Sequence, residues 1–207
     1  MPERADLPVL EFETAEEFER WLEREHGAAR GIWLRFAKKG SQTRSVTYQQ
    51  AVLVALCFGW IDGQARSEGE ASWLQRFTPR TRKSVWSQIN RRRVEELIAQ
   101  GRMRPAGLAE IEKAKADGRW DAAYPPPSTA AVPPDLAAAF AAAPGAEAFF
   151  AGLDSRNRYA VLHRIATART PATRAARIRV FVEMLEKGEL LYPRDVSGQP
   201  RPQEHGP

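Results

Sequence analysis

A proline-rich segment over residues 121–134 is the feature that most constrains what this chain can fold into. Three consecutive prolines at 125–127 and two at 133–134 bracket small serine and alanine residues. Proline fixes its own φ angle and has no backbone N–H to donate, so the segment suits neither a helix interior nor a central strand. We predict a semi-stiff linker that divides the 207 residues into two structural units.

Two capping-box motifs mark helix starts upstream of the linker. Thr14 is followed three positions later by Glu17, and Thr47 by Gln50. At this spacing the two side chains satisfy backbone N–H groups at a helix N-terminus. We therefore expect helices over about residues 14–26 and from residue 47 on. The second is apolar nearly all round, which predicts a buried helix.

Runs rich in β-branched and aromatic residues predict strands in the same part of the chain. These runs lie at residues 31–36, 60–63 and 72–77. The last two are expected to pair across the polar loop 66–71, and further helices to begin near Ser84 and at Pro105. We predict an α+β fold for residues 5–120, with a small, mostly antiparallel sheet and helices packed beside it.

Downstream of the linker every pattern is helical. The last predicted helix begins at Thr170-Pro171 and carries an apolar stripe of Ile178, Phe181, Val182 and Leu185. We predict an all-helical C-terminal unit over residues 135–190 and a disordered tail over 194–207. Arg174 borders the apolar stripe, and we expect it to tie the helical unit to the first domain through an ion pair.

Charge and cysteine content limit the classes of protein that the chain can represent. The formal net charge is +5, and the basic residues are densest in the expected helix 84–104. Such a cluster can attract nucleic acid, although a solvated helix face is an equally simple explanation. Cys57 is the one cysteine, which excludes an internal disulfide and suits a reducing cytoplasm. With no signal-peptide pattern and no apolar run of about 20 residues, we expect a cytoplasmic protein without a membrane span.

Two segments combine a tryptophan with short polar residues where regular structure is expected to break. The first runs from Ala55 to Gly63 and contains Trp60 and Asp62. The second begins at Phe77 and continues through Arg80 to Asn90, with Trp86 between them. A plain apolar core would explain the tryptophans but not the polar residues that accompany them.

These segments, with others along the chain, resemble the bacterial YdeI/OmpD-associated family, often called bacteriocin-protection proteins. The matching stretches are the Trp33 strand with Lys38-Lys39, Thr47-Tyr48, residues 56–63, Phe77-Thr78-Pro79-Arg80, residues 84–90, Gly101-Arg102-Met103, residues 114–120, and Thr173-Arg174 with Arg177-Ile178. The resemblance covers about residues 15–190. It implies a role in tolerance to bacteriocins or other envelope stress. It implies no known reaction and supplies no catalytic residues.

We predict a ligand-binding cleft in the first domain. Trp86 and Asn90 stand four positions apart, so both would project from one face of the expected helix, with Arg80 at its N-terminus favouring an anion. The alternative is that Trp86 belongs to the core and that Asp62-Gly63 is a simple turn. The candidate ligand-binding residues are Trp60, Asp62, Arg80, Trp86, Asn90, Lys38 and Tyr48.

The chain shows no catalytic or metal-binding signature. It lacks a phosphate-binding P-loop, a dinucleotide fingerprint, an HExxH motif and a CxxC motif, so we predict no cofactor and no metal site. Cys57 lies on the apolar helix, where burial raises the pKa of a thiol and makes it a poor nucleophile.

The leading functional hypothesis is a non-enzymatic cytoplasmic protein that binds a small anionic ligand or a protein partner. One alternative is a nucleic-acid-binding protein that uses the basic helix 84–104, and another is an enzyme of a type without a recognisable motif. A steep fall of affinity with salt would distinguish nucleic acid from a ligand held by stacking and hydrogen bonds.

Overall fold

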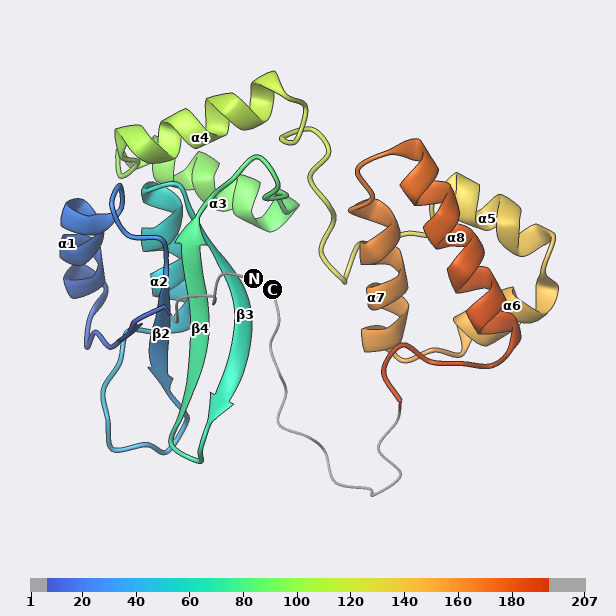
Figure 1. The fold of residues 1–207 in the computed structure, drawn as a ribbon, viewed down its shortest axis with the longest axis horizontal. Coiled ribbons are helices and arrows are strands. Elements are labelled where there is room, and N and C mark those ends of the chain that lie inside the picture. The colour runs from blue at the N-terminus through green and yellow to red at the C-terminus, as the bar shows by residue number, and fades with distance from the viewer. Residues whose placement is uncertain (1–6, 194–207) are drawn as a thin grey trace, which may run out of the picture. The chain divides into compact units, whose positions relative to one another are not determined.

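The computed structural model describes residues 7–193, and the predicted tail 194–207 lies outside the described residues. The chain forms two compact units, which meet in sequence between Ala123 and Tyr124. We call the part before this boundary unit 1 and the part after it unit 2 (Figure 1). The boundary falls within the proline-rich segment.

Unit 1 combines a four-stranded sheet with helices, which confirms the α+β prediction. Its elements are β1 (Val9–Leu10), α1 (Ala15–Glu25), β2 (Ile32–Ala37), α2 (Tyr48–Cys57), β3 (Trp60–Glu68), β4 (Ser72–Pro79), α3 (Gln88–Ala99) and α4 (Pro105–Ala116). The strands lie in the order β1-β2-β4-β3. Only β1 and β2 run parallel in this sheet, so the sheet is mostly antiparallel as predicted.

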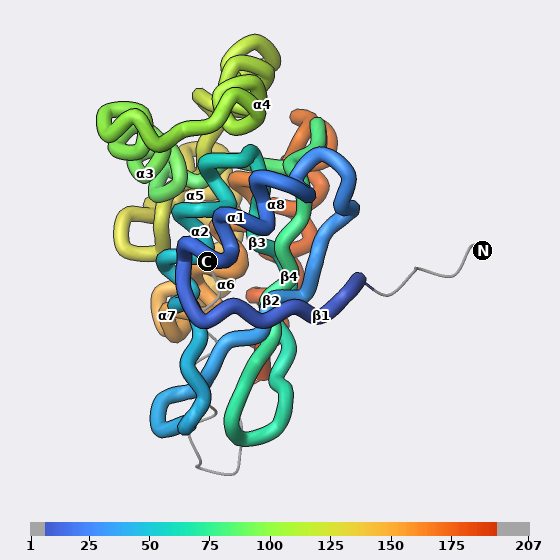
Figure 2. Tube along the Cα trace, turned by 90° about the vertical axis from the view of Figure 1, so that its left-hand side faces the viewer, coloured from blue at the N-terminus to red at the C-terminus, as the bar shows by residue number. Residues whose placement is uncertain are grey.

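The two faces of the sheet have different surroundings. Side chains of a strand alternate between faces, so Ile32, Leu34 and Phe36 share one face, and all three lie in the core cluster with α1 and α2. In Figure 2 α1 and α2 lie to one side of the strands. Trp33 and Arg35 share the opposite face and remain partly exposed. Helices α1 and α2 therefore cover one face of the sheet.

Helix α2 is buried on most of its surface and contacts α1, α3, α4 and β3. The predicted capping box is present: Thr47 Oγ1 accepts from the Gln50 backbone N–H at 3.3 Å, and Gln50 Oε1 accepts from the Thr47 backbone N–H at 3.0 Å. Gly107 of α4 lies against α2 so closely that a Cβ at this position would stand 2.2 Å from the Cys57 carbonyl oxygen. The packing of α4 on α2 therefore requires a residue without a side chain at position 107.

The helix expected from Ser84 begins four residues later, at Gln88. Ser87 is its N-cap, and the Ser87 hydroxyl accepts from the Asn90 backbone N–H at 3.1 Å. Ser84 instead stabilises a preceding turn, in which its hydroxyl accepts from the Thr81 N–H at 3.0 Å. Trp86 thus precedes the helix, and the predicted shared helix face of Trp86 and Asn90 is wrong.

Unit 2 is all helical in the part of the chain that the structure describes. Its helices are α5 (Pro134–Ala141), α6 (Pro144–Ala151), α7 (Ser155–Ala166) and α8 (Pro171–Glu186). Helix α8 contacts each of the other three, and its buried stripe of Ile178, Phe181 and Leu185 matches the predicted one. The helical prediction for this region is confirmed.

Arg174 holds unit 2 together internally. Its Nη2 donates to Asp135 Oδ1 at 2.8 Å and its Nη1 to the Ile165 carbonyl oxygen at 3.0 Å. These contacts join the start of α8 to α5 and to the end of α7. The expectation that Arg174 pairs with the first domain is therefore wrong, because its carboxylate partner lies 39 positions upstream in the same unit.

We expect Gly107→Ala to destabilise unit 1 by about 2 kcal/mol, because the added methyl group overpacks the α2–α4 contact. All six tryptophans, at positions 21, 33, 60, 73, 86 and 120, precede Ala123, so tryptophan fluorescence during urea unfolding reports on unit 1. Gly27→Ala, just after α1 in the same unit, is the control because nothing lies within 4 Å of its new Cβ. Equal fluorescence midpoints for Gly107→Ala and the wild type would contradict the close contact.

We expect the ion pair between Arg35 and Glu68 to add acid sensitivity. Arg35 lowers the pKa of Glu68 to about 2 by hydrogen bonding to its carboxylate. A lowered folded-state pKa gives stability above the usual value of 4.5, and this stability is lost as the pH falls toward about 2. The stability difference between wild type and Glu68→Gln should therefore shrink over this pH range. Glu70→Gln at the exposed hairpin tip should follow the wild type.

Candidate functional site

The structure distributes the seven predicted site residues over several places in unit 1. It brings together Tyr48 with Asp62, and Arg80 with Trp86, as two separate pairs. The two predicted segments do meet, because Trp60 pairs with Pro79 and Asp62 with Phe77 across β3 and β4. The side chains nevertheless do not line one pocket.

Tyr48 and Asp62 form a short hydrogen bond between α2 and β3. The Tyr48 hydroxyl donates to Asp62 Oδ2 at 2.6 Å, and both side chains are half-buried. Asp62 faces the helix side of the sheet, and the strand register shifts immediately after it, between Asp62 and Ala65. The carboxylate thereby fixes the phenol ring at the first turn of α2.

Arg80 and Trp86 form a packed structural cluster. The Arg80 guanidinium carbon lies 3.6 Å from the centre of the Trp86 ring, and Arg80 Nη1 donates to the Val85 carbonyl oxygen at 3.2 Å. The Trp86 and Trp120 rings pack edge to face, with their centres 4.9 Å apart. Arg80 is 6% and Trp86 2% exposed, so neither presents a surface on which a ligand could bind.

The remaining predicted residues also have structural contacts. Trp60 is buried, and its indole N–H donates to the His26 carbonyl oxygen at 3.3 Å. Asn90 accepts from Arg93 Nη1 at 3.0 Å. Lys38 Nζ donates to the Gly69 carbonyl oxygen at 2.7 Å, at the tip of the β3–β4 hairpin. Each of these side chains therefore has a structural role in its own part of unit 1.

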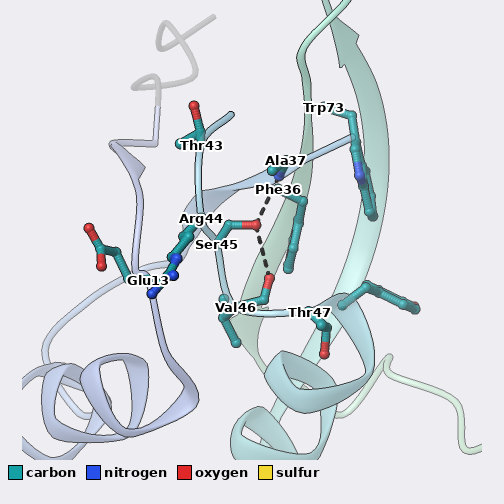
Figure 3. A pocket seen from close by; sticks show the side chains of 10 residues that line it. Glu13, Phe36, Ala37, Thr43, Arg44, Ser45, Val46, Thr47 and Trp73 are labelled. Atoms are coloured by element: carbon teal, nitrogen blue, oxygen red, sulfur yellow. Dashed lines mark hydrogen bonds between the residues drawn. The ribbon is translucent and has the colours of Figure 1, made fainter. Parts of the chain in front are cut away.

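A pocket of about 520 Å³ lies where the end of β2 meets the loop before α2. We call it the aromatic pocket (Figure 3). It contains one predicted residue, Tyr48. Its lining residues are Glu13, Phe36, Ala37, Thr43, Arg44, Ser45, Val46, Thr47, Tyr48 and Trp73.

Three aromatic side chains form the apolar part of this pocket. Phe36 and Trp73 are cross-strand partners in β2 and β4, and their rings stack with centres 4.8 Å apart. The centre of the Tyr48 ring lies 5.8 Å from the centre of the Trp73 ring and 6.1 Å from that of the Phe36 ring. Aromatic rings at these distances attract one another. Phe36 is only 2% exposed and supports the wall from behind, so the half-buried Trp73 and Tyr48 rings provide its flat apolar surface.

Hydrogen bonds to backbone groups hold the loop before α2, which completes the pocket. Ser45 Oγ accepts from the Ala37 N–H at 2.9 Å and donates to the Val46 carbonyl oxygen at 3.2 Å, as drawn in Figure 3. The Val46 N–H donates to the Phe12 carbonyl oxygen at 2.9 Å. The loop is thus attached both to β2 and to the segment before α1.

Two opposite charges lie at the rim of the pocket. Glu13 and Arg44 are both exposed, and within residues 7–193 neither side chain forms an ion pair. In Figure 3 they lie on one side of the loop that carries Ser45, and Phe36 and Trp73 lie on the other. The pocket therefore offers a charged end and an aromatic end.

Sequence reasoning missed the residues that matter most in this pocket. Phe36 and Trp73 were assigned to strands, but their pairing depends on the register of β2 against β4, which local patterns do not reveal. The alternation of side chains along a strand could have indicated them. Phe36 and Trp73 each lie on the same face as the buried residues two and four positions away in their strands.

The basic helix offers less free charge than its sequence indicates. Arg91 Nη1 donates to the Trp120 carbonyl oxygen at 2.9 Å, and Arg93 contacts Asn90. Glu95 and Glu96 are exposed on the same helix. Of the three consecutive arginines 91–93, only Arg92 is exposed, and the other two are half-buried. These contacts weaken the case for nucleic-acid binding by this helix.

The described residues contain neither a cluster of metal ligands nor a membrane-spanning helix. Between residues 7 and 193, no three His, Cys, Asp or Glu side chains gather as metal ligands would. No helix in that range is long and apolar enough to cross a membrane. Cys57 is buried, and burial raises the pKa of its thiol.

A different known family matches each of the two units. Residues 129–188 match the family Bacteriocin-protection, YdeI or OmpD-Associated, and residues 10–110 match a domain of unknown function, DUF8412. No curated protein and no solved structure gave a match. The resemblance to the YdeI/OmpD-associated family is therefore confirmed over residues 129–188. Most of the motifs that suggested it lie instead in the segment that the second family model matches.

We expect the Tyr48–Asp62 hydrogen bond to stabilise unit 1 by about 1 kcal/mol, since its acceptor is a half-exposed carboxylate. A double-mutant cycle of Tyr48→Phe and Asp62→Asn, followed by tryptophan fluorescence in urea, measures this coupling. Additive effects of the two substitutions would show that the bond contributes nothing.

Proposed function

We propose that the protein is a non-enzymatic binding protein and that the aromatic pocket holds a small planar ligand with an anionic end. The observation that carries this proposal is the half-buried Trp73 ring, stacked on the buried Phe36, in a pocket of about 520 Å³. Ligand sites commonly have volumes of about 300–1,000 Å³, with apolar walls and a few polar groups. The pocket meets this description.

Support for a planar ligand comes from the shape of the apolar wall. Trp73 and Tyr48 are half-buried, so part of each ring remains accessible from the pocket. A flat ring bound there would bury apolar surface and add stacking with indole and phenol rings. Asp62 keeps the Tyr48 ring in place, which lowers the entropy lost on binding.

Support for an anionic end comes from two sources of positive potential. Arg44 lines the pocket and forms no ion pair within residues 7–193. Thr47 and Tyr48, at the N-terminus of α2, line it as well. A helix N-terminus carries about half a positive charge, which favours a carboxylate or phosphate nearby. Glu13, at the same rim, would disfavour a ligand with two anionic groups close together.

Support for binding without catalysis comes from the polar groups nearest the pocket. The Ser45 hydroxyl already accepts one hydrogen bond and donates another, so both serve to hold the loop. The Cys57 thiol is buried, with a raised pKa. Neither group is arranged as an activated nucleophile.

The biological role that we propose is protection against bacteriocins or related envelope stress. It rests on the name of the family that residues 129–188 match. A cytoplasmic location is proposed on the sequence argument that a single cysteine suits a reducing compartment. In this proposal unit 1 supplies the ligand pocket and unit 2 the part that is shared with the family.

A thermal-shift series tests the anionic end. Benzoate, phenylacetate and indole-3-acetate should raise the melting temperature of unit 1, because a ligand that binds the folded state stabilises it by mass action. The corresponding neutral amides should have a smaller effect. Arg44→Ala, an exposed substitution, should remove the difference between acids and amides. A chain that responds to none of the six compounds would contradict the proposal.

A matched pair of tryptophan substitutions tests the place of binding. Trp73→Ala removes one wall of the pocket, whereas Trp33→Ala removes a half-buried tryptophan from the opposite face of the same sheet. The apparent affinity for indole-3-acetate, obtained from the thermal shift, should fall at least tenfold for Trp73→Ala. It should stay unchanged for Trp33→Ala. Equal losses in both variants would place binding elsewhere.

A further inference from the structure

The sheet face opposite α1 and α2 carries a cluster of arginines around one tryptophan. The strand register pairs Trp33 with Arg76, and Leu74 with both Arg35 and Arg66. Directly paired residues point to the same side of a sheet, so all five side chains share one face. We call Trp33, Arg35, Arg66, Leu74 and Arg76 the open face.

The open face is accessible although it encloses a small apolar centre. Arg66 is exposed, and Trp33, Arg35 and Arg76 are half-buried. Leu74 is only 2% exposed, yet it does not belong to the core on the helix side. Arginine side chains cover such a residue with their aliphatic stems and keep their charged ends in water.

Only one of the three arginines is neutralised by carboxylates. Arg35 donates to Glu68 at 2.6 Å and 2.9 Å, and to Glu11 at 3.1 Å. Arg66 and Arg76 form no ion pair within the described part of the chain. The Nε of Arg76 is buried and has no hydrogen-bond acceptor among the described residues. Two guanidinium groups on neighbouring strands are therefore left for an external anion.

The tryptophan indicates which anion suits this face. The Arg66 guanidinium carbon lies 4.3 Å from the centre of the Trp33 ring, so a planar cation and a planar aromatic group are already stacked on an open surface. Single-stranded nucleic acids bind through bases stacked on aromatic side chains and phosphates held by arginines. An acidic peptide would use the charges but would gain nothing from the indole ring.

We propose that the open face binds single-stranded nucleic acid. A base takes the place of the Arg66 guanidinium on the Trp33 ring, and Arg66 and Arg76 each hold a phosphate. This surface is different from the basic helix 84–104, whose arginines are largely engaged in contacts within unit 1. It also lies on the opposite side of the sheet from the aromatic pocket, so the two proposals succeed or fail independently.

Fluorescence anisotropy with a labelled oligouridylate of about 12 nucleotides tests the proposal at about 50 and 200 mM salt. The full chain should bind, and the double variant Arg66→Gln/Arg76→Gln should lose at least tenfold in affinity. Each lost phosphate contact should also lower the slope of log affinity against log salt by about 0.7. Trp33→Ala should weaken binding about tenfold while leaving the salt slope unchanged.

Arg92→Gln is the control for the single variants Arg66→Gln and Arg76→Gln, because each of the three removes one positive charge and Arg92 is an exposed arginine of α3. Arg92→Gln should bind as the wild type does, and so should Arg44→Ala in the aromatic pocket. Circular dichroism confirms that each variant is folded. The proposal is overturned if the wild type does not bind the oligonucleotide, or if Arg92→Gln weakens binding as much as Arg66→Gln or Arg76→Gln does. Equal binding of a labelled oligoglutamate peptide would also overturn it, in favour of an acidic protein partner.

Discussion

The structure of unit 1 depends on the burial of α2. Its sequence is apolar on nearly every side, so water must be excluded from the whole circumference of the helix. The contacts of α2 with β3, α1, α3 and α4 achieve this. The contact with α4 is the tightest, because the Cys57 carbonyl oxygen occupies the space that a side chain at Gly107 would need. One helix therefore determines where the others pack.

This arrangement gives the sheet two different faces. Helices α1 and α2 cover one face of the sheet, and the other face is shielded only by its own side chains. Strand alternation then divides adjacent residues between the two environments: Phe36 faces the aromatic pocket, and Arg35 beside it belongs to the open face. Both candidate binding surfaces thus follow from the same strands, and a one-residue register shift would exchange them.

Local chemistry predicted the elements well where one residue dominates the outcome. The N-caps Thr14 and Thr47 located α1 and α2, although Glu17 accepts from the Glu13 N–H and so closes no capping box with Thr14. The two predicted strands 60–63 and 72–77 do pair, but β3 continues to Glu68 and takes up part of the predicted loop 66–71. The start of α3 was missed because Ser84 and Ser87 are both competent caps. Tertiary packing of Trp86 against Trp120 and Arg80 keeps residues 84–86 out of the helix. The predicted cleft depended on this helix start, and its geometry changed with it.

The aromatic pocket could not be predicted in the same way, because it depends on contacts between residues far apart in the sequence. Phe36 meets Trp73 only through the register of β2 against β4, and the loop is positioned by Ser45 bonding to Ala37. The family match covers residues 129–188, and the pocket lies outside that range. The family match therefore concerns unit 2. The pocket is then a separate property of unit 1, so the chemistry of its ligand has to be argued from the residues that line it.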